Sequence, residues 1–152
     1  KLLKKGIQKV DKIFSNKIDP KKVFTSCNIE MIGTESKSVK NSAYITGCEK
    51  TDFGAILQKN LKGTNCNFYQ DPYPDQKLFY RSDNARLASQ GVPAHTISTS
   101  KMDSEPNYHK QSDEIGTLDM NNMAEIIKAI AISSGTIISG KDTPTRVGME
   151  DK

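Results

Sequence analysis

The pattern of hydrophobic and polar positions divides the chain into alternating predicted helices and strands. Between residues 2 and 14, apolar side chains recur every three or four positions, which is typical of an amphipathic helix. The run from Lys22 to Gly33 is almost continuously apolar and favours a strand buried on both faces. The other predicted elements are a strand at 43–48, a helix from Thr51 to Gly63, an aromatic loop at 64–74, a short helix at 84–90, a strand at 92–98 and a helix from Asp119 to Gly140.

This order of elements predicts an α/β layer fold with a mixed sheet. Only three strands are found in the pattern, so the sheet is thin and part of it is expected to be missing. The length of 152 residues suits one domain. Residues 1–140 are expected to form its packed part, and residues 141–152 a polar, frayed tail.

Composition narrows the possible partners. The net charge is +4 and lysines crowd the first 22 residues, but Asp11 and Asp19 interrupt them and no arginine-rich or aromatic pattern accompanies them. A nucleic-acid interface needs a clustered patch and a recognisable module, so we expect no nucleic-acid partner. No apolar run approaches the length of about 18 residues that a membrane-spanning helix requires.

Three cysteines, Cys27, Cys48 and Cys66, are present, and none forms a CxxC pair. An odd number without such spacing is not a disulfide scaffold, and the pairing state of the three thiols stays open. Cys27 lies in an apolar run, where we expect a buried small hydrophobe.

Candidate chemistry centres on His109, one of only two histidines in the chain. It follows Tyr108 and precedes Asp113 in a polar stretch without apolar periodicity, so it is expected on a loop. A loop histidine in this setting can be a metal ligand, a general base or a solvated side chain. Glu30 interrupts the apolar run near its end; it either points to solvent or is paired or metal-bound. His95, inside the predicted third strand, is interpreted as structural.

Three segments resemble the di-zinc exopeptidase family of bacterial and vacuolar aminopeptidases, which is related to glutamate carboxypeptidase and glutaminyl cyclase. Asn28-Ile29-Glu30-Met31-Ile32-Gly33 is similar to the family's "N-[LIF]-[DE]-M-I-G" strand. Arg81-Ser82-Asp83 with Gly91-Val92-Pro93-Ala94 is similar to its "RSD…GIPA" segment. Asn107-Tyr108-His109 with Asp113 resembles its "YHxxxD" loop. The order of the three motifs along the chain also matches.

The resemblance implies a three-layer phosphorylase/hydrolase-like mixed sheet with helices on both faces, of which only the C-terminal part is present. It implies that Glu30 and His109 are zinc ligands, although family members usually carry Asp at the position of Glu30. Tyr108 would donate its hydroxyl to the developing oxyanion. Arg81 would recognise the substrate carboxylate or backbone, or else pair structurally with Asp83 or another acid. Asp113 would orient the His109 loop.

The family also uses a His-x-Asp strand, a bridging Asp and a Glu-Glu pair, which this chain does not contain. We therefore expect part of a zinc-dependent aminopeptidase-type metallopeptidase that is inactive as an isolated chain, with a peptide substrate and a missing N-terminal half or self-association to complete it. The alternative is a non-catalytic peptide-binding or interaction module on the same scaffold. A glutaminyl-cyclase-type acyl transfer ranks last, because its pocket normally has tryptophan and this chain has none. The resemblance favours a secreted or periplasmic location.

Overall fold

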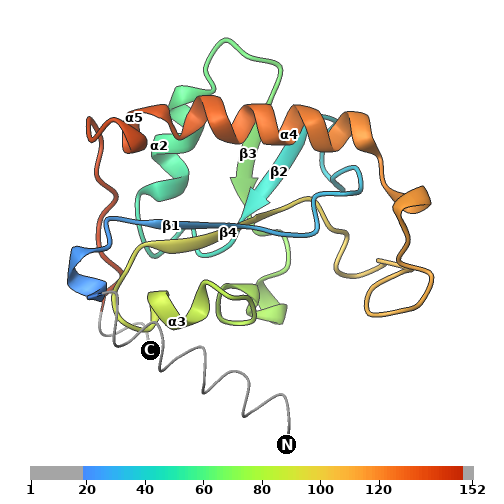
Figure 1. Ribbon diagram of the computed structural model, residues 1–152, viewed down its shortest axis with the longest axis horizontal. Coiled ribbons are helices and arrows are strands. Elements are labelled where there is room, and N and C mark those ends of the chain that lie inside the picture. Colours follow the sequence, from blue (N-terminus) through green and yellow to red (C-terminus); the bar gives the residue numbers. More distant parts are fainter. Residues whose placement is uncertain (1–18, 149–152) are drawn as a thin grey trace, which may run out of the picture.

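The computed structural model describes residues 19–148, and the helix predicted for residues 2–14 lies outside this range. Four short strands form one mixed sheet in the order β1-β4-β2-β3 (Figure 1). β1 runs parallel to β4 and β2 parallel to β3, whereas β2 and β4 are antiparallel. The strands are β1 (Ser26–Ile29), β2 (Ser42–Ile45), β3 (Asn67–Gln70) and β4 (Ala94–Ser98). The prediction of an α/β protein with a mixed sheet is confirmed.

Eight helical segments connect and cover these strands within the described residues. The α-helices are α2 (Phe53–Asn60), α3 (Ala85–Ala88), α4 (Met120–Ser133) and α5 (Gly135–Ile138), and the 3-10 helices are η1 (Pro20–Lys22), η2 (Pro74–Gln76), η3 (Leu78–Tyr80) and η4 (Ile115–Thr117). Figure 1 shows α2, α4 and α5 on one side of the sheet and α3 on the other.

One of the four strands, β3, was not predicted. β3 lies within the stretch that the sequence indicated as an aromatic loop, and it pairs with β2 from Asn67 to Gln70. Its four residues are too few to show a period of two in a stretch rich in turn residues. Tertiary contacts define it instead: Phe68 is buried, and its backbone N–H donates to Gln58 Oε1 of α2 at 2.7 Å.

The prediction that the first strand is buried on both faces is wrong. β1 has a single neighbour, β4, among the described strands, and is therefore an edge strand. Phe24 is 74% exposed and Ile29 45% exposed. Cys27 is exposed as well, which corrects the expectation of a buried thiol.

Both long helices begin and pack close to the predicted positions. Asp119 caps α4, accepting a hydrogen bond from the backbone N–H of Asn122 at 2.9 Å. In front of α2, Thr51 Oγ1 accepts from the backbone N–H of Phe53 at 3.1 Å. The sequence pattern predicts an apolar stripe on α4 formed by Met123, Ile126, Ile127 and Ile130. Ile126 is buried, but Ile127 is 51% exposed, because it is turned about 100° further around the helix.

The segment after α5 packs against the body of the protein as far as it is described. Arg146 donates from its guanidinium to the carbonyl oxygens of Val23 and Pro20, at 2.8 and 3.1 Å. Val147 is 4% exposed and belongs to an apolar cluster with Phe79. The polar composition predicts a frayed tail over residues 141–152, and Arg146 and Val147 within it make these contacts.

The two faces of the sheet differ in chemistry. Ala43, Ile45 and Ile97 point towards α2 and α4 and join the main apolar core with Leu57 and Ile126. The residues that alternate with them point to the opposite face, because successive side chains of a strand alternate. These residues are Tyr44, Thr46, Thr96 and Ser98, all buried. One face of the sheet therefore holds the main core, and the other carries the hydroxyls of these residues beside two smaller apolar clusters.

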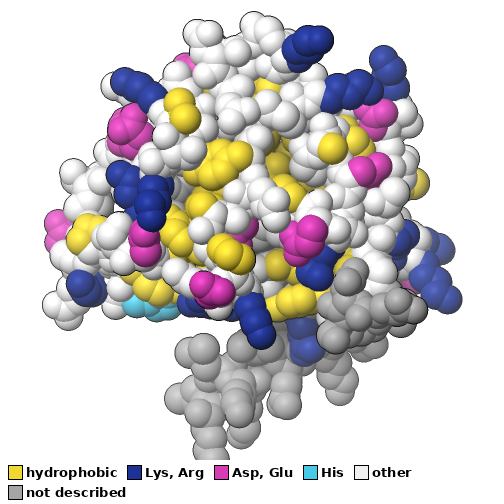
Figure 2. Space-filling view, turned by 180° about the vertical axis from the view of Figure 1, so that it is seen from behind, with side chains coloured by type: hydrophobic (Ala, Val, Ile, Leu, Met, Phe, Trp, Pro, Cys, Tyr) yellow, Lys and Arg dark blue, Asp and Glu magenta, His cyan; other side chains and the backbone are white. Residues whose placement is uncertain are grey.

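Several large apolar side chains remain on the surface. Among them, Ile115 is 81% exposed and Ile138 79% exposed. Figure 2 shows hydrophobic side chains gathered in the middle of one face, with lysine, arginine and acidic side chains mostly around them. Contiguous apolar surface of this kind marks a contact region more often than scattered single residues do.

Candidate functional site

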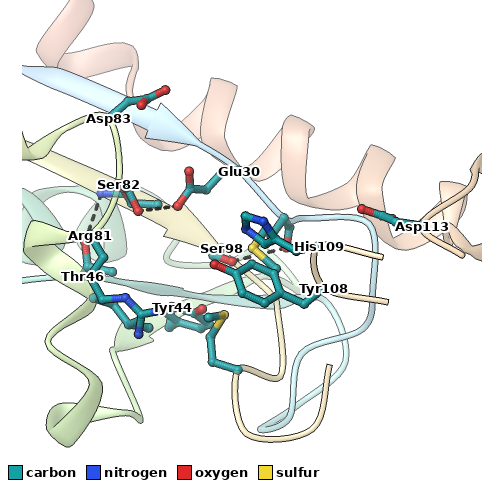
Figure 3. A pocket seen from close by; sticks show the side chains of 14 residues that line it. Glu30, Tyr44, Thr46, Arg81, Ser82, Asp83, Ser98, Tyr108, His109 and Asp113 are labelled. Atoms are coloured by element: carbon teal, nitrogen blue, oxygen red, sulfur yellow. Dashed lines mark hydrogen bonds between the residues drawn. The ribbon is translucent and has the colours of Figure 1, made fainter. Parts of the chain in front are cut away.

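A cavity of about 460 Å³ lies over the polar face of the sheet, next to the carboxyl end of β1. Its floor is formed by the polar residues of β2 and β4 defined above. Its walls come from the segment after β1, the segment around η3 and the loop after β4. All five residues that the sequence predicted as site residues line it: Glu30, Arg81, Tyr108, His109 and Asp113 (Figure 3).

Glu30 comes directly after β1 and is half-buried. Its backbone N–H donates to the carbonyl oxygen of Ile97 in β4 at 3.3 Å, which continues the β1–β4 ladder. Both of its carboxylate oxygens accept hydrogen bonds: Oε1 from the Ser82 hydroxyl and Oε2 from Asn28 Nδ2, the latter at 3.2 Å. Of the two placements that the sequence left open, the structure has Glu30 pointing into the cavity (Figure 3).

Two residues at the cavity have left-handed backbone conformations, which residues other than glycine seldom adopt. Met31 has a φ of 50° and His109 a φ of 58°. The carbonyl oxygen of Met31 accepts hydrogen bonds from Thr99 and Ser98, which hold this conformation. Such strained residues persist where the surroundings fix them, and they gather at functional sites.

Tyr108 and His109 sit on the loop that closes one side of the cavity. Their rings meet edge to face, with centroids 4.1 Å apart, and Tyr108 is 39% exposed. The backbone N–H of Lys110 donates to Asn107 O at 2.9 Å, so a tight turn presents the histidine. Glu30 and His109, far apart in the sequence, thus lie at the same cavity (Figure 3).

Asp113 and Arg81 stand further out. Asp113 also lines a smaller cavity of about 70 Å³, together with Gly33 and Leu118. Its backbone N–H donates to Lys110 O at 3.2 Å, which helps to fold the loop. Arg81 is exposed, and its guanidinium donates to the backbone and side-chain oxygens of Gln76 at 3.4 and 3.3 Å, a partner that the sequence did not suggest.

The second histidine has a structural environment, as interpreted. His95 is fully buried, and its ring stacks on Phe53 with centroids 5.0 Å apart. Its Nδ1 lies 2.8 Å from Thr46 O and its Nε2 2.7 Å from Thr51 Oγ1. Burial lowers the pKa of this imidazole, so the neutral form is favoured.

Sequence reasoning missed the residues that form the floor of the cavity and hold Glu30. The signal was present in β4 and at the end of β2, where the alternating residues carry hydroxyls: Tyr44, Thr46 directly after β2, Thr96 and Ser98. Burial raises the pKa of Tyr44, so its phenol stays protonated. The roles of Asn28 and Ser82 could not be read from spacing, because each depends on which segments meet in space.

The donor types at the cavity suit a transition metal, but their number is small. A carboxylate oxygen from Glu30 and an imidazole nitrogen from His109 are ordinary zinc ligands, and a zinc site takes three or four protein ligands. Within residues 19–148, no group of three or more His, Cys, Asp or Glu side chains lies close enough to hold a metal ion. Glu30 and His109 alone are fewer ligands than such a zinc site takes.

Comparison with known proteins identifies the family. The model of peptidase family M28 matches residues 8–133, well over half of the chain, so the chain belongs to peptidase family M28. This membership supports a peptidase-type function with a peptide substrate, in a family of generally metal-dependent enzymes. No curated protein and no solved structure matches the chain. In the described part, none of the helices combines the length and the apolar character needed to span a membrane.

Proposed function

We propose that this chain contributes part of the active site of a zinc-dependent, aminopeptidase-type exopeptidase that hydrolyses terminal peptide bonds. The observation that supports this most is the convergence of Glu30, Tyr108 and His109, from distant parts of the sequence, on one cavity. Membership of peptidase family M28 supports the peptidase class.

In this proposal each residue has a distinct role. Glu30 and His109 hold zinc through a carboxylate oxygen and an imidazole nitrogen. Zinc bound there would polarise the scissile carbonyl and lower the pKa of a bound water. The Tyr108 hydroxyl, partly exposed on the loop, donates a hydrogen bond to the carbonyl oxygen as negative charge develops on it. Arg81 is free to turn its planar fork to the substrate, because its present partner Gln76 holds it only through long hydrogen bonds.

Asp113 acts on the site through the loop. It lines both the main cavity and the smaller one, and its backbone closes the turn after His109. Its role in the proposal is to orient the segment that carries His109.

The isolated chain is expected to be nearly inactive, because two ligands neither complete a zinc site nor supply the general base. The remaining ligands and the base would come from another polypeptide segment or another chain. Purified protein incubated with zinc and aminoacyl-nitroanilides should release nitroaniline at the background rate. Robust hydrolysis by the 152-residue chain would show that the site is complete, against this proposal.

Zinc binding tests the metal ligands directly. We expect the wild-type chain to bind zinc weakly in competition with a chelating dye, since affinity falls with each absent ligand. Glu30→Gln and His109→Ala should each weaken this binding by at least tenfold. Glu114→Gln is the matched control, because Glu114 is exposed on the same loop and does not line the cavity. Equal affinity in all four proteins would refute Glu30 and His109 as ligands.

A non-catalytic peptide-binding module is the second candidate. It is favoured by the small donor set among the described residues. A fluorescent peptide library titrated with the chain, with and without EDTA, separates the two functions. Peptide binding that EDTA leaves unchanged supports the module, whereas binding that needs zinc supports the metallopeptidase site.

A further inference from the structure

A row of hydrogen-bonded side chains runs beneath the cavity and ends on Glu30. Asn28 Nδ2 lies 3.2 Å from Glu30 Oε2 and 3.2 Å from Thr96 Oγ1. Thr96 Oγ1 lies 3.0 Å from Asn84 Oδ1. The row therefore crosses from the edge strand β1 to β4 and on to the start of α3.

Asn84 fixes the direction of every hydrogen bond in this row. Its side-chain nitrogen lies 2.9 Å from the carbonyl oxygens of Phe79 and Ala94, which can only accept. The nitrogen of the amide must face these two carbonyls, so Oδ1 faces Thr96 and the Thr96 hydroxyl donates to it. The lone pairs of Thr96 Oγ1 are then turned to Asn28, which must present its N–H₂ group.

Both hydrogens of the Asn28 amide are committed as a result, one to Thr96 and one to Glu30. Without the Thr96 hydroxyl, only the Glu30 carboxylate itself would hold the Asn28 amide in this orientation. The flipped orientation would turn its carbonyl oxygen towards the Glu30 carboxylate, where two acceptors repel each other.

Burial makes the row a defined part of the structure. Asn84 is 2% exposed and Thr96 1% exposed, so water cannot easily replace a lost partner, and buried polar groups are rarely left unpaired. Ser82, which donates to the other carboxylate oxygen of Glu30, lies on the segment between Phe79 and Asn84. The amide of Asn84 therefore acts on both oxygens of Glu30. Its nitrogen fixes the segment that carries Ser82, the donor to Oε1. Its oxygen begins the row that ends at Oε2.

We propose that Thr96 is a positioning residue for the Glu30 carboxylate. Its hydroxyl donates to Asn84 and accepts from Asn28. The Asn28 amide therefore keeps an N–H towards Glu30 and orients the carboxylate for metal binding. This inference rests on the proposed function, in which Glu30 is a metal ligand. Partners that orient a metal ligand typically change metal affinity by about 10- to 100-fold when they are removed.

The test compares two substitutions at one position. Thr96→Val keeps the shape and removes the hydroxyl, whereas Thr96→Ser keeps the hydroxyl and removes the methyl group. We expect Thr96→Val to weaken zinc binding by about 10-fold or more and Thr96→Ser to retain it. A purely packing role would give the opposite order, and equal affinity in wild type and Thr96→Val would overturn the proposal.

A second variant covers the case in which Thr96→Val does not fold. Asn28→Leu removes the amide at the half-buried end of the row, where the fold is least affected. It should lose zinc affinity to the same extent, while circular dichroism and the thermal unfolding midpoint confirm a folded chain. Wild-type zinc affinity in folded Asn28→Leu would overturn the proposal.

A readout without metal separates this inference from the proposed function. In ¹⁵N-labelled wild-type protein, the two side-chain amide protons of Asn28 should exchange with water more slowly than those of the exposed Asn121. In Thr96→Val this difference should disappear, and in Thr96→Ser it should persist. If it persists in Thr96→Val, the row does not work as described, whatever the zinc measurements give. If the difference in exchange rate disappears in Thr96→Val and the wild-type chain binds no zinc, the row of hydrogen bonds is supported but the proposed metal function is refuted.

Discussion

The two faces of the sheet are made by neighbouring residues of the same strands, yet they have opposite chemistry. In β4, Ile97 packs into the core under α2 and α4, while Thr96 and Ser98 point to the cavity. In β2, Ile45 packs into the same core, while Tyr44 points to the cavity. All five side chains are buried, so burial alone does not distinguish core from site. The difference is that Ile45 and Ile97 make apolar contacts only, whereas Thr96 and Ser98 on the other face make side-chain hydrogen bonds.

The largest expected effect comes from adjacent substitutions on the two faces. Ile97→Ala should lower the free energy of unfolding by about 2–5 kcal/mol, since it leaves a cavity in the main core. Ser98→Ala should cost only about 0.5–1.5 kcal/mol, because the side chain loses hydrogen bonds beside a solvent-accessible cavity. Urea unfolding of both variants measures the difference. Equal losses would mean that the polar face contributes as much to stability as the apolar face.

A second prediction concerns pH and His95, which lies on the apolar side against Phe53. Burial lowers its pKa in the folded state, so the unfolded chain binds a proton more readily. Stability should therefore be complete above the unfolded pKa of about 6.5 and fall as the pH decreases below it. The measurement is the thermal unfolding midpoint between pH 5 and pH 8.

His95→Gln serves as the control for this pH dependence. Glutamine can still bond Thr46 and Thr51 but does not titrate. The variant should lose the part of the pH dependence between pH 5 and pH 7 that His95 causes, while its stability near pH 7.5 should decrease, because the ring contact with Phe53 is lost. An unchanged pH profile would show that other groups, and not this histidine, cause the acid sensitivity.

The sequence predicted the elements whose signals are local. Asp119 before α4 and the 3.6-residue spacing of α4 require only neighbours along the chain, and both are found in the structure. β3 and the edge position of β1 depend on which strands pair, and neither could be inferred from a short apolar run. The assumption that an apolar run is buried on both faces fails for an edge strand, because one neighbour covers it only partly.

The candidate site shows the same division. Glu30, Tyr108 and His109 were identified through motifs, and the structure places them at one cavity without testing their proposed roles. Asn28 and Ser82 lie within the quoted motifs and Asn84 directly follows one, but the motifs gave them no role, because their importance comes from hydrogen bonds between segments far apart in sequence. Positioning residues are therefore the part of a site that sequence reasoning is least able to find.

The last prediction concerns the open edge of the sheet and has the smallest effect on folding stability. The backbone N–H of Ser26 donates to Pro93, just before β4, and that of Glu30 to Ile97 in β4, so those of Cys27 and Ile29 point outwards. No lysine or proline lies between Thr25 and Ile29 to prevent pairing with another strand. With Phe24 and Ile29 also exposed, we expect the purified chain to self-associate through β1 at high concentration.

Ile29→Lys places a charge on this edge and should reduce association while changing the free energy of unfolding by no more than about 0.5 kcal/mol. Ile138→Lys is the matched control, because Ile138 is 79% exposed on α5 and not on the sheet. Light scattering across a concentration series measures the mass of wild type and both variants. If Ile138→Lys reduces association as much as Ile29→Lys, the contact is a general apolar one and not strand pairing. A wild-type monomer that binds no hydrophobic dye would show that the sheet edge is stable without a partner, and would favour the peptide-binding module over an incomplete enzyme site.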